Sequence, residues 1–178
     1  MRNPRIAYHR EIGQAMILGL FFLLVFLALG AALVDGYALV EARNWGYQAV
    51  QQSALAGAST GRRWDSVEDG CIELDESRAY ETATSVLESE LDRRGLSGFH
   101  FEVQVLPGAF GGSLPDFPPQ SVRLAGWQMG WTVHEPAVGV YLSFPVHTFF
   151  LSIFHLPSVP IYVFASASVA QPAGVCIP

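Results

Sequence analysis

The sequence contains no lysine, and its ten basic residues are all arginines. Sixteen acidic residues bring the net charge to -6 at pH 7, so the chain lacks the dense basic surface that nucleic-acid binding requires. Charged residues make up only 15% of the chain, whereas soluble domains usually carry about a quarter. The composition therefore argues against a nucleic-acid partner and against an ordinary soluble enzyme.

Residues and motifs that carry chemistry are equally scarce. The two cysteines, Cys71 and Cys176, lie too far apart in the sequence for a zinc ribbon or a haem attachment. None of the five histidines has a metal-ligand spacing, and the sequence contains neither a nucleotide-binding glycine motif nor a nucleophile elbow. We therefore expect no catalytic, cofactor or metal site, no small-molecule substrate and no enzymatic activity.

The sequence does contain one long apolar run, residues 12–34, without a charged side chain. About 20 apolar residues in a helix cross a hydrocarbon core of roughly 30 Å, so this run predicts a transmembrane helix. A cleaved signal peptide is the alternative, because Ala28-Leu29-Gly30 is an acceptable cleavage site. Signal peptides have an apolar region of only about 7–15 residues, so the length favours an uncleaved signal anchor.

The residues that flank this run predict its direction in the membrane. Arg2, Arg5 and Arg10 precede it with a single Glu11, and the positive-inside rule places residues 1–11 in the cytoplasm. Residues 35–178 then form one extracytoplasmic domain of a single-pass cell-membrane protein. That domain carries seven arginines and fifteen acidic residues, a net charge of -8. Anionic lipid surfaces would repel it, so the helix itself is the predicted anchor in the bilayer.

Small residues line one face of the predicted span. Ala28, Ala32 and Gly36 follow one another at intervals of four, a spacing that allows a second membrane helix to approach closely. Small residues are also common in spans that face only lipid. The pattern predicts a helix-packing face toward other membrane subunits, with an incidental stripe as the alternative.

The rest of the sequence predicts an α+β fold. The first helix continues outside the membrane to about residue 58, and apolar residues at helical spacing predict a second helix over residues 75–94, with Asp75 as N-cap and Gly95 as C-cap. Alternating apolar residues then predict four strands, at residues 99–105, 122–133, 138–144 and 161–169. A bulge at Gly126 explains the shift of phase in the second strand. We expect a pilin-like architecture: a long helix, a second helix and an antiparallel sheet of about four strands.

The segment between the last two strands, residues 147–157, is unusually apolar for a loop. It contains Phe149, Phe150 and Phe154. A small domain needs its apolar residues inside, which favours a cap on the sheet core. The alternative is a contact surface for a partner subunit or for the membrane.

Cys71 and Cys176 both lie in the predicted extracytoplasmic part, where disulfides persist. A bridge between them would tie the C-terminal tail to the segment before the second helix. Two unpaired buried thiols are the alternative, because a sequence does not show proximity.

The sequence contains Gly13-Gln14-Ala15, Asp35-Gly36-Tyr37 and an alanine-rich run from Ser53 to Ala58. These motifs resemble the N-terminal region of the TadE/TadG-like family of tight-adherence (Flp) pilus assembly proteins, and the last predicted strand resembles the final strand of such proteins. Leu18 and Gln52 depart from the family pattern, in which acidic residues are usual. The resemblance implies a non-enzymatic, uncleaved minor pseudopilin that acts by helix packing and extracytoplasmic protein contacts. An accessory subunit of a respiratory or photosynthetic membrane complex is the alternative function.

Overall fold

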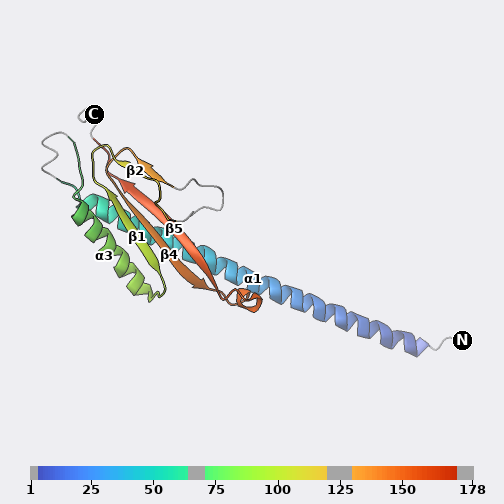
Figure 1. Cartoon of the computed structure of the whole chain (residues 1–178). Coiled ribbons are helices and arrows are strands. Elements are labelled where there is room, and N and C mark those ends of the chain that lie inside the picture. The colour runs from blue at the N-terminus through green and yellow to red at the C-terminus, as the bar shows by residue number, and fades with distance from the viewer. Residues whose placement is uncertain (1–3, 64–70, 120–129, 172–178) are drawn as a thin grey trace. The chain divides into compact units, whose positions relative to one another are not determined.

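The computed structural model of the chain describes residues 4–63, 71–119 and 130–171. Its elements form two compact units, one made of Met1–Val40 with His147–Val159 and the other of Glu41–Val146 with Pro160–Pro178. The element order is a long apolar helix, a second helix and then antiparallel strands (Figure 1). The predicted α+β fold is therefore confirmed.

The first helix, α1, runs without interruption from Pro4 to Thr60. Its sequence contains no proline after the first residue, so no backbone hydrogen bond has to be broken along its length. The prediction that the helix continues well beyond the apolar run is confirmed. Gly61 follows its last residue and donates its N–H to the carbonyl of Gly57 over 2.9 Å.

The second helix, α3, runs from Glu76 to Arg94. The Asp75 carboxylate accepts a hydrogen bond from the backbone N–H of Arg78 over 3.0 Å, and this bond satisfies one of the unpaired donors at the helix start. Gly95 adopts the left-handed conformation with φ of 62°, which suits a residue without Cβ at the helix end. Both predicted caps are confirmed.

Three strands form the main sheet in the order β1-β4-β5: β1 (His100–Leu106), β4 (Ala137–His147) and β5 (Ser158–Ser168). β1 and β4 are antiparallel, with His100 opposite Ser143 and Leu106 opposite Ala137. β4 contains the predicted strand at residues 138–144, and β1 and β5 match the predictions at residues 99–105 and 161–169 except for one residue at one end of each prediction. The first half of the central β4, from Ala137 to Leu142, is fully buried because layers cover both of its faces.

The remaining strands differ from the prediction of one four-stranded sheet. β2 (Gly112–Leu114) and β3 (Trp131–Val133) form a separate two-stranded ribbon. β2 lies in a stretch rich in glycine and proline, outside the four predicted strands. Most of the predicted second strand, including Gly126, lies outside the described residues.

The ribbon separates from the main sheet because it covers one face of that sheet. Trp131 and Phe117 are buried together, with ring centroids 5.7 Å apart. They pack over Gly139 of β4, where an added Cβ would come within 2.9 Å of the Phe117 ring. A strand that packs over the face of β4 cannot also lie beside it as a fourth strand.

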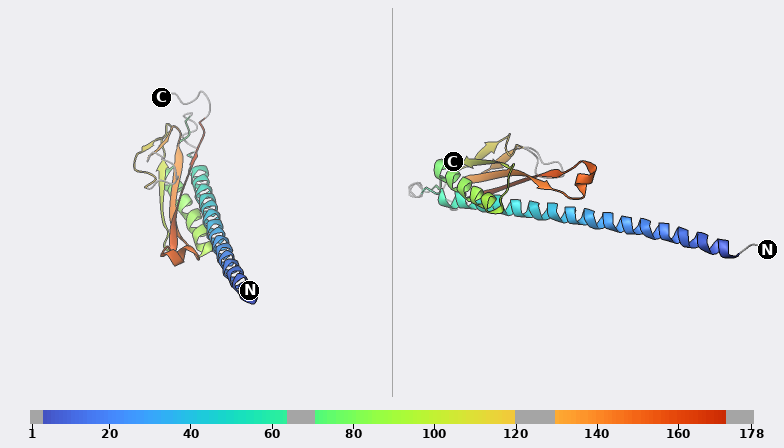
Figure 2. Two further views of the ribbon diagram at one scale, coloured as in Figure 1. Left: turned by 90° about the vertical axis from the view of Figure 1, so that its right-hand side faces the viewer. Right: turned by 90° about the horizontal axis from the view of Figure 1, so that it is seen from below.

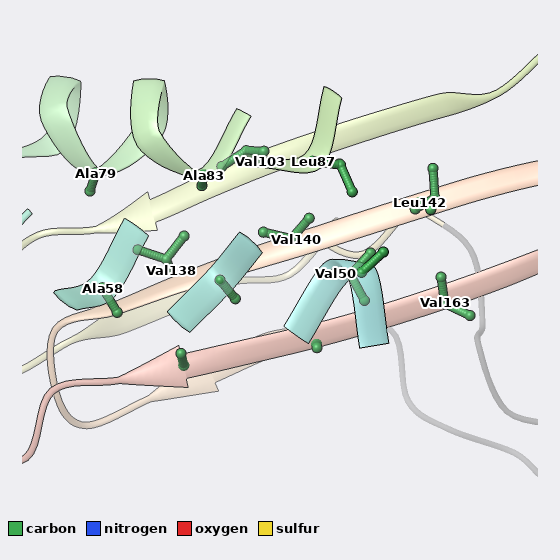
Figure 3. Close-up of a cluster of buried hydrophobic side chains, with 14 of the residues drawn as sticks. Val50, Ala58, Ala79, Ala83, Leu87, Val103, Val138, Val140, Leu142 and Val163 are labelled. Carbon is green, nitrogen blue, oxygen red and sulfur yellow. The ribbon is translucent and has the colours of Figure 1, made fainter. Parts of the chain in front are cut away.

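The other face of the sheet carries the main core of the second unit. Both views of Figure 2 show α3 and the second half of α1 on this side and the ribbon on the opposite side. Figure 3 shows Val50 of α1, Leu87 of α3 and Val140 of β4 pointing into the same layer, and all three are fully buried. Burial of an aliphatic side chain contributes roughly 1.5–3 kcal/mol, so this layer is a main source of stability.

Small residues bring α1 and α3 unusually close together. A Cβ at Gly57 would lie 2.8 Å from the carbonyl oxygen of Ala79 and 3.0 Å from the Cβ of Ala83. The buried hydroxyl of Ser53 donates a hydrogen bond to the Ala83 carbonyl. The alanine-rich run at residues 53–58 is thus a surface for close helix packing inside this chain.

Candidate functional site at the end of the apolar helix

The candidate site belongs to the first unit, and its main element is the apolar half of α1. The helix from Met16 to Thr60 is long and apolar enough to cross a membrane, with mean hydropathy of 2.9 in its most apolar stretch. None of that stretch is buried within the protein, so it is not the core helix of a soluble domain. Length and composition of this kind are shared by membrane anchors and signal sequences. The helix is therefore a possible membrane anchor.

The predicted packing face of this helix is open. Ala28, Ala32 and Gly36 are all exposed. A Cβ built at Gly36 would meet no atom within 4 Å. The face is therefore accessible to another helix, and its contact with one stays a prediction.

Asp35 follows the apolar run directly and is the most unusual residue of the unit. Only 4% of it is exposed, although it is an ionisable residue in the middle of a long helix. Its carboxylate accepts hydrogen bonds from the backbone N–H groups of Phe149 over 2.9 Å and of Phe150 and Leu151 over 2.8 Å each. The loop between β4 and β5 is thereby held against the helix (Figure 1).

These three hydrogen bonds act as a helix cap supplied from another element. A short 3₁₀ helix, η1, spans Leu151–Phe154, and the side chain of its N-cap residue Phe150 makes no capping hydrogen bond. The first N–H groups of a helix have no partner within it and must find one elsewhere. The carboxylate of Asp35 provides that partner, and its negative charge is also favourable at a helix start.

The surroundings of Asp35 favour its charged form. Burial by itself raises the pKa of Asp35, but the hydrogen bonds from Leu151, Phe149 and Phe150 together outweigh that effect. They hold the pKa of Asp35 below its ordinary value of 3.8. Asp35 is therefore ionised at neutral pH.

The two hydroxyl side chains of the loop bond to the loop's own backbone, whereas His155 is exposed. The Thr148 hydroxyl is largely buried and donates to the Leu156 carbonyl over 2.6 Å. The Ser152 hydroxyl donates to the Phe149 carbonyl over 2.6 Å. Together with Asp35 these hydroxyls fix the loop in one compact turn.

Several apolar side chains of the loop are exposed instead. Phe149 is 81% exposed, Ile153 is 66% exposed and Leu156 is 52% exposed. Of the residues singled out from the sequence, Phe150 is half-buried and Phe154 ends η1, with a side chain outside the described part. The exposure of Phe149 favours a contact surface over a cap on the sheet core, and the identity of any partner stays a prediction.

Asp35 was not predicted as a site residue, whereas Ile153 and Leu156 belong to the apolar segment that the sequence indicated at residues 147–157. A signal for Asp35 exists in the helix pattern. Asp35 is four residues after Ala31 and four before Leu39, and these two apolar residues are both partly buried. An acidic residue on the contacting face of an apolar helix has to be paired, because a lone buried charge is very unfavourable.

The predicted disulfide is not tested, because Cys176 lies outside the described residues. A neighbouring contact does bring the two regions together. The side-chain amide of Gln171 accepts a hydrogen bond from the Ile72 N–H over 2.9 Å and donates one to the Ile72 carbonyl over 2.6 Å. Ile72 is adjacent to Cys71, so the pairing of Cys71 with Cys176 stays a prediction that this contact supports.

Among the described residues no group of three or more His, Cys, Asp or Glu side chains could hold a metal ion. An open depression near the start of α3 is lined by arginine and acidic side chains together, among them Arg62, Arg78 and Glu76. Neither finding identifies a reaction, and the absence of enzymatic activity stays a prediction. No family model, no curated protein and no solved structure matches the chain.

Proposed function

We propose that this chain is a single-pass membrane subunit with a structural role, similar to TadE/TadG-like pilus assembly proteins. Residues 12–34 would cross the membrane, residues 1–11 would be cytoplasmic, and residues 35–178 would form the extracytoplasmic domain. The subunit would act through helix packing in the membrane and protein contacts outside it.

The observation that carries this proposal is the exposure of the apolar half of α1. Side chains such as Phe21, Leu24 and Phe26 are more than half exposed around the helix. Burying an apolar side chain of this size is worth roughly 1.5–3 kcal/mol, so a long row of them needs an apolar environment. A bilayer supplies such an environment over a helix length of about 20 residues.

The continuity of α1 also supports an anchor over a discarded signal. The same helix that begins in the apolar run ends in the core of the second unit, where Val50 and Ala54 are fully buried. The family resemblance adds the pilus assembly context, and it rests on the motifs at residues 13–15, 35–37 and 53–58.

The topology can be tested with the full chain in its native membrane. Protease added to intact spheroplasts should digest a C-terminal tag and leave an N-terminal tag protected, and lysis should expose both. The intact mass should equal that of the uncleaved 19.4 kDa chain. Protection of the C-terminal tag would contradict the orientation, and a mass that lacks the apolar run would show a cleaved signal peptide.

The assembly partner can be identified by copurification. The matched variants Ala32→Ile and Leu33→Ile alter neighbouring exposed residues of the span, but only the first adds volume to the predicted packing face. We expect Ala32→Ile to reduce recovery of the partner and Leu33→Ile to leave it unchanged. Equal recovery with both variants would contradict helix packing through this face.

A further inference from the structure

The loop from Thr148 to Pro157 has an inverted polarity for a water-exposed loop. Its apolar side chains at Phe149, Ile153 and Leu156 are mostly exposed, while the hydroxyls of Thr148 and Ser152 bond to the loop's own carbonyls. The segment contains no Asp, Glu, Lys or Arg. A loop that functions in water usually places these groups the other way round.

Most backbone N–H groups of the loop also form hydrogen bonds within the protein and do not need water as a partner. Three N–H groups bond to Asp35, and four more bond to carbonyls of the loop. These four donors belong to Thr148, Ile153, His155 and Leu156. Irregular backbone near hydrocarbon requires this kind of internal pairing, because lipid tails offer no hydrogen bonds.

The loop lies at the level where the predicted span ends. Its three hydrogen bonds to Asp35 attach it one residue beyond Val34, the last residue of the apolar run. Around this level α1 also exposes Leu33, Val34 and Tyr37. The exposed apolar side chains of the loop thus lie at the same level as those at the end of the predicted span, and aromatic side chains favour this boundary region of a bilayer.

From these observations we infer that the loop is a second membrane contact, which inserts Phe149, Ile153 and Leu156 into the outer leaflet beside the helix. The inference rests on the proposed membrane anchor. Its occupant is lipid, because the loop is attached at the level where the predicted span ends and contains no Asp, Glu, Lys or Arg side chain that would orient a protein partner. Asp35 is the positioning residue, since it holds the loop at the boundary.

Photo-crosslinking from three aromatic positions tests the inference in the full chain. p-Benzoylphenylalanine would replace Phe149 in the loop, Phe22 in the span or Tyr80 on α3, all of them exposed side chains. The experiment would be carried out in the native membrane and repeated with the purified chain in phosphatidylcholine nanodiscs. Mass spectrometry would separate lipid adducts from protein adducts.

We expect lipid adducts at positions 149 and 22 and none at position 80. The substitution Asp35→Ala should reduce the lipid adduct at position 149 and leave that at position 22 unchanged. A protein adduct at position 149, or no adduct there while position 22 labels lipid, would overturn the inference and leave the anchor intact. No lipid adduct at position 22 would overturn the anchor, and the inference with it.

Discussion

The two halves of α1 belong to one continuous helix but meet different surroundings. From Met16 to Val40 the helix exposes large apolar side chains on nearly every side. After Glu41 it buries one stripe, which includes Ala49, Val50 and Ala54, and exposes its charged and amide side chains. One continuous helical backbone therefore runs through both halves. The side chains differ, because an exposed apolar half and a half that packs on a protein core need different residues on their faces.

The largest expected effect is on the stability of the second unit, which should depend on the predicted disulfide. Replacing Cys71 and Cys176 by serine should lower the free energy of unfolding of the second unit by about 4–5 kcal/mol, since a loop of roughly a hundred residues is no longer closed. The apolar half of α1 should keep its helical signal. Denaturation of the full chain in detergent, followed by circular dichroism and tryptophan fluorescence, measures both.

Counting alkylated thiols by mass before and after reduction supplies the control for that experiment. Two thiols that alkylate without reduction would contradict the disulfide. Equal stability of the native and serine chains would show that the bridge, if formed, does not constrain the unfolded state.

Matched glycine substitutions compare the two halves of α1 directly. Gly57→Leu should destabilise the second unit by about 3 kcal/mol, the upper part of the range for overpacking, because a Cβ there meets backbone of α3 at 2.8 Å. Gly36→Leu adds the same side chain where nothing lies within 4 Å. We expect the midpoint of denaturation to fall for the first variant and to stay unchanged for the second. Similar midpoints for both variants would contradict the close helix contact.

The smallest expected effect is the local loss of the hydrogen bonds between Asp35 and the loop when Asp35 is protonated. The hydrogen bonds of Asp35 lower its pKa in the folded chain. The stability that they contribute is therefore complete above the unfolded-state pKa of about 3.9, and it is lost as the pH falls through the lower folded value. In NMR spectra of the chain in micelles, the amide protons of Phe149, Phe150 and Leu151 should shift together below about pH 4.

The variant Asp35→Asn provides the control for this titration, because it has no carboxylate to protonate. Its amide shifts for residues 149–151 should not change over the same pH range. Shifts that persist in the variant, or shifts at only one of the three amides, would show that Asp35 does not hold the loop as a unit.

Much of the fold could be predicted because local signals decide it. The lack of proline predicts a continuous α1, Asp75 and Gly95 predict the ends of α3, and alternation in residues 138–144 predicts the central strand. The two-stranded ribbon could not be predicted, because its short strands are recognisable only by what they cover. Phe117 and Trp131 pack over Gly139, a contact between residues distant in the sequence.

The candidate site was predicted only in part. The apolar residues of the loop at 147–157 drew attention by composition, but composition does not distinguish a buried aromatic residue from an exposed one. From the sequence, Asp35 was distinguished only as part of a family motif. Its hydrogen bonds to residues more than a hundred positions away depend on how the chain returns to the helix.

The sequence by itself determined the apolar helix and the α+β class, because length, composition and periodicity are properties of neighbouring residues. Only the tertiary structure decided that Asp35 caps η1, that Phe149 faces outward and that Gly57 lets α3 approach α1. Each of these depends on which distant atoms meet, and burial or hydrogen bonding at such a contact is fixed only when the chain has folded.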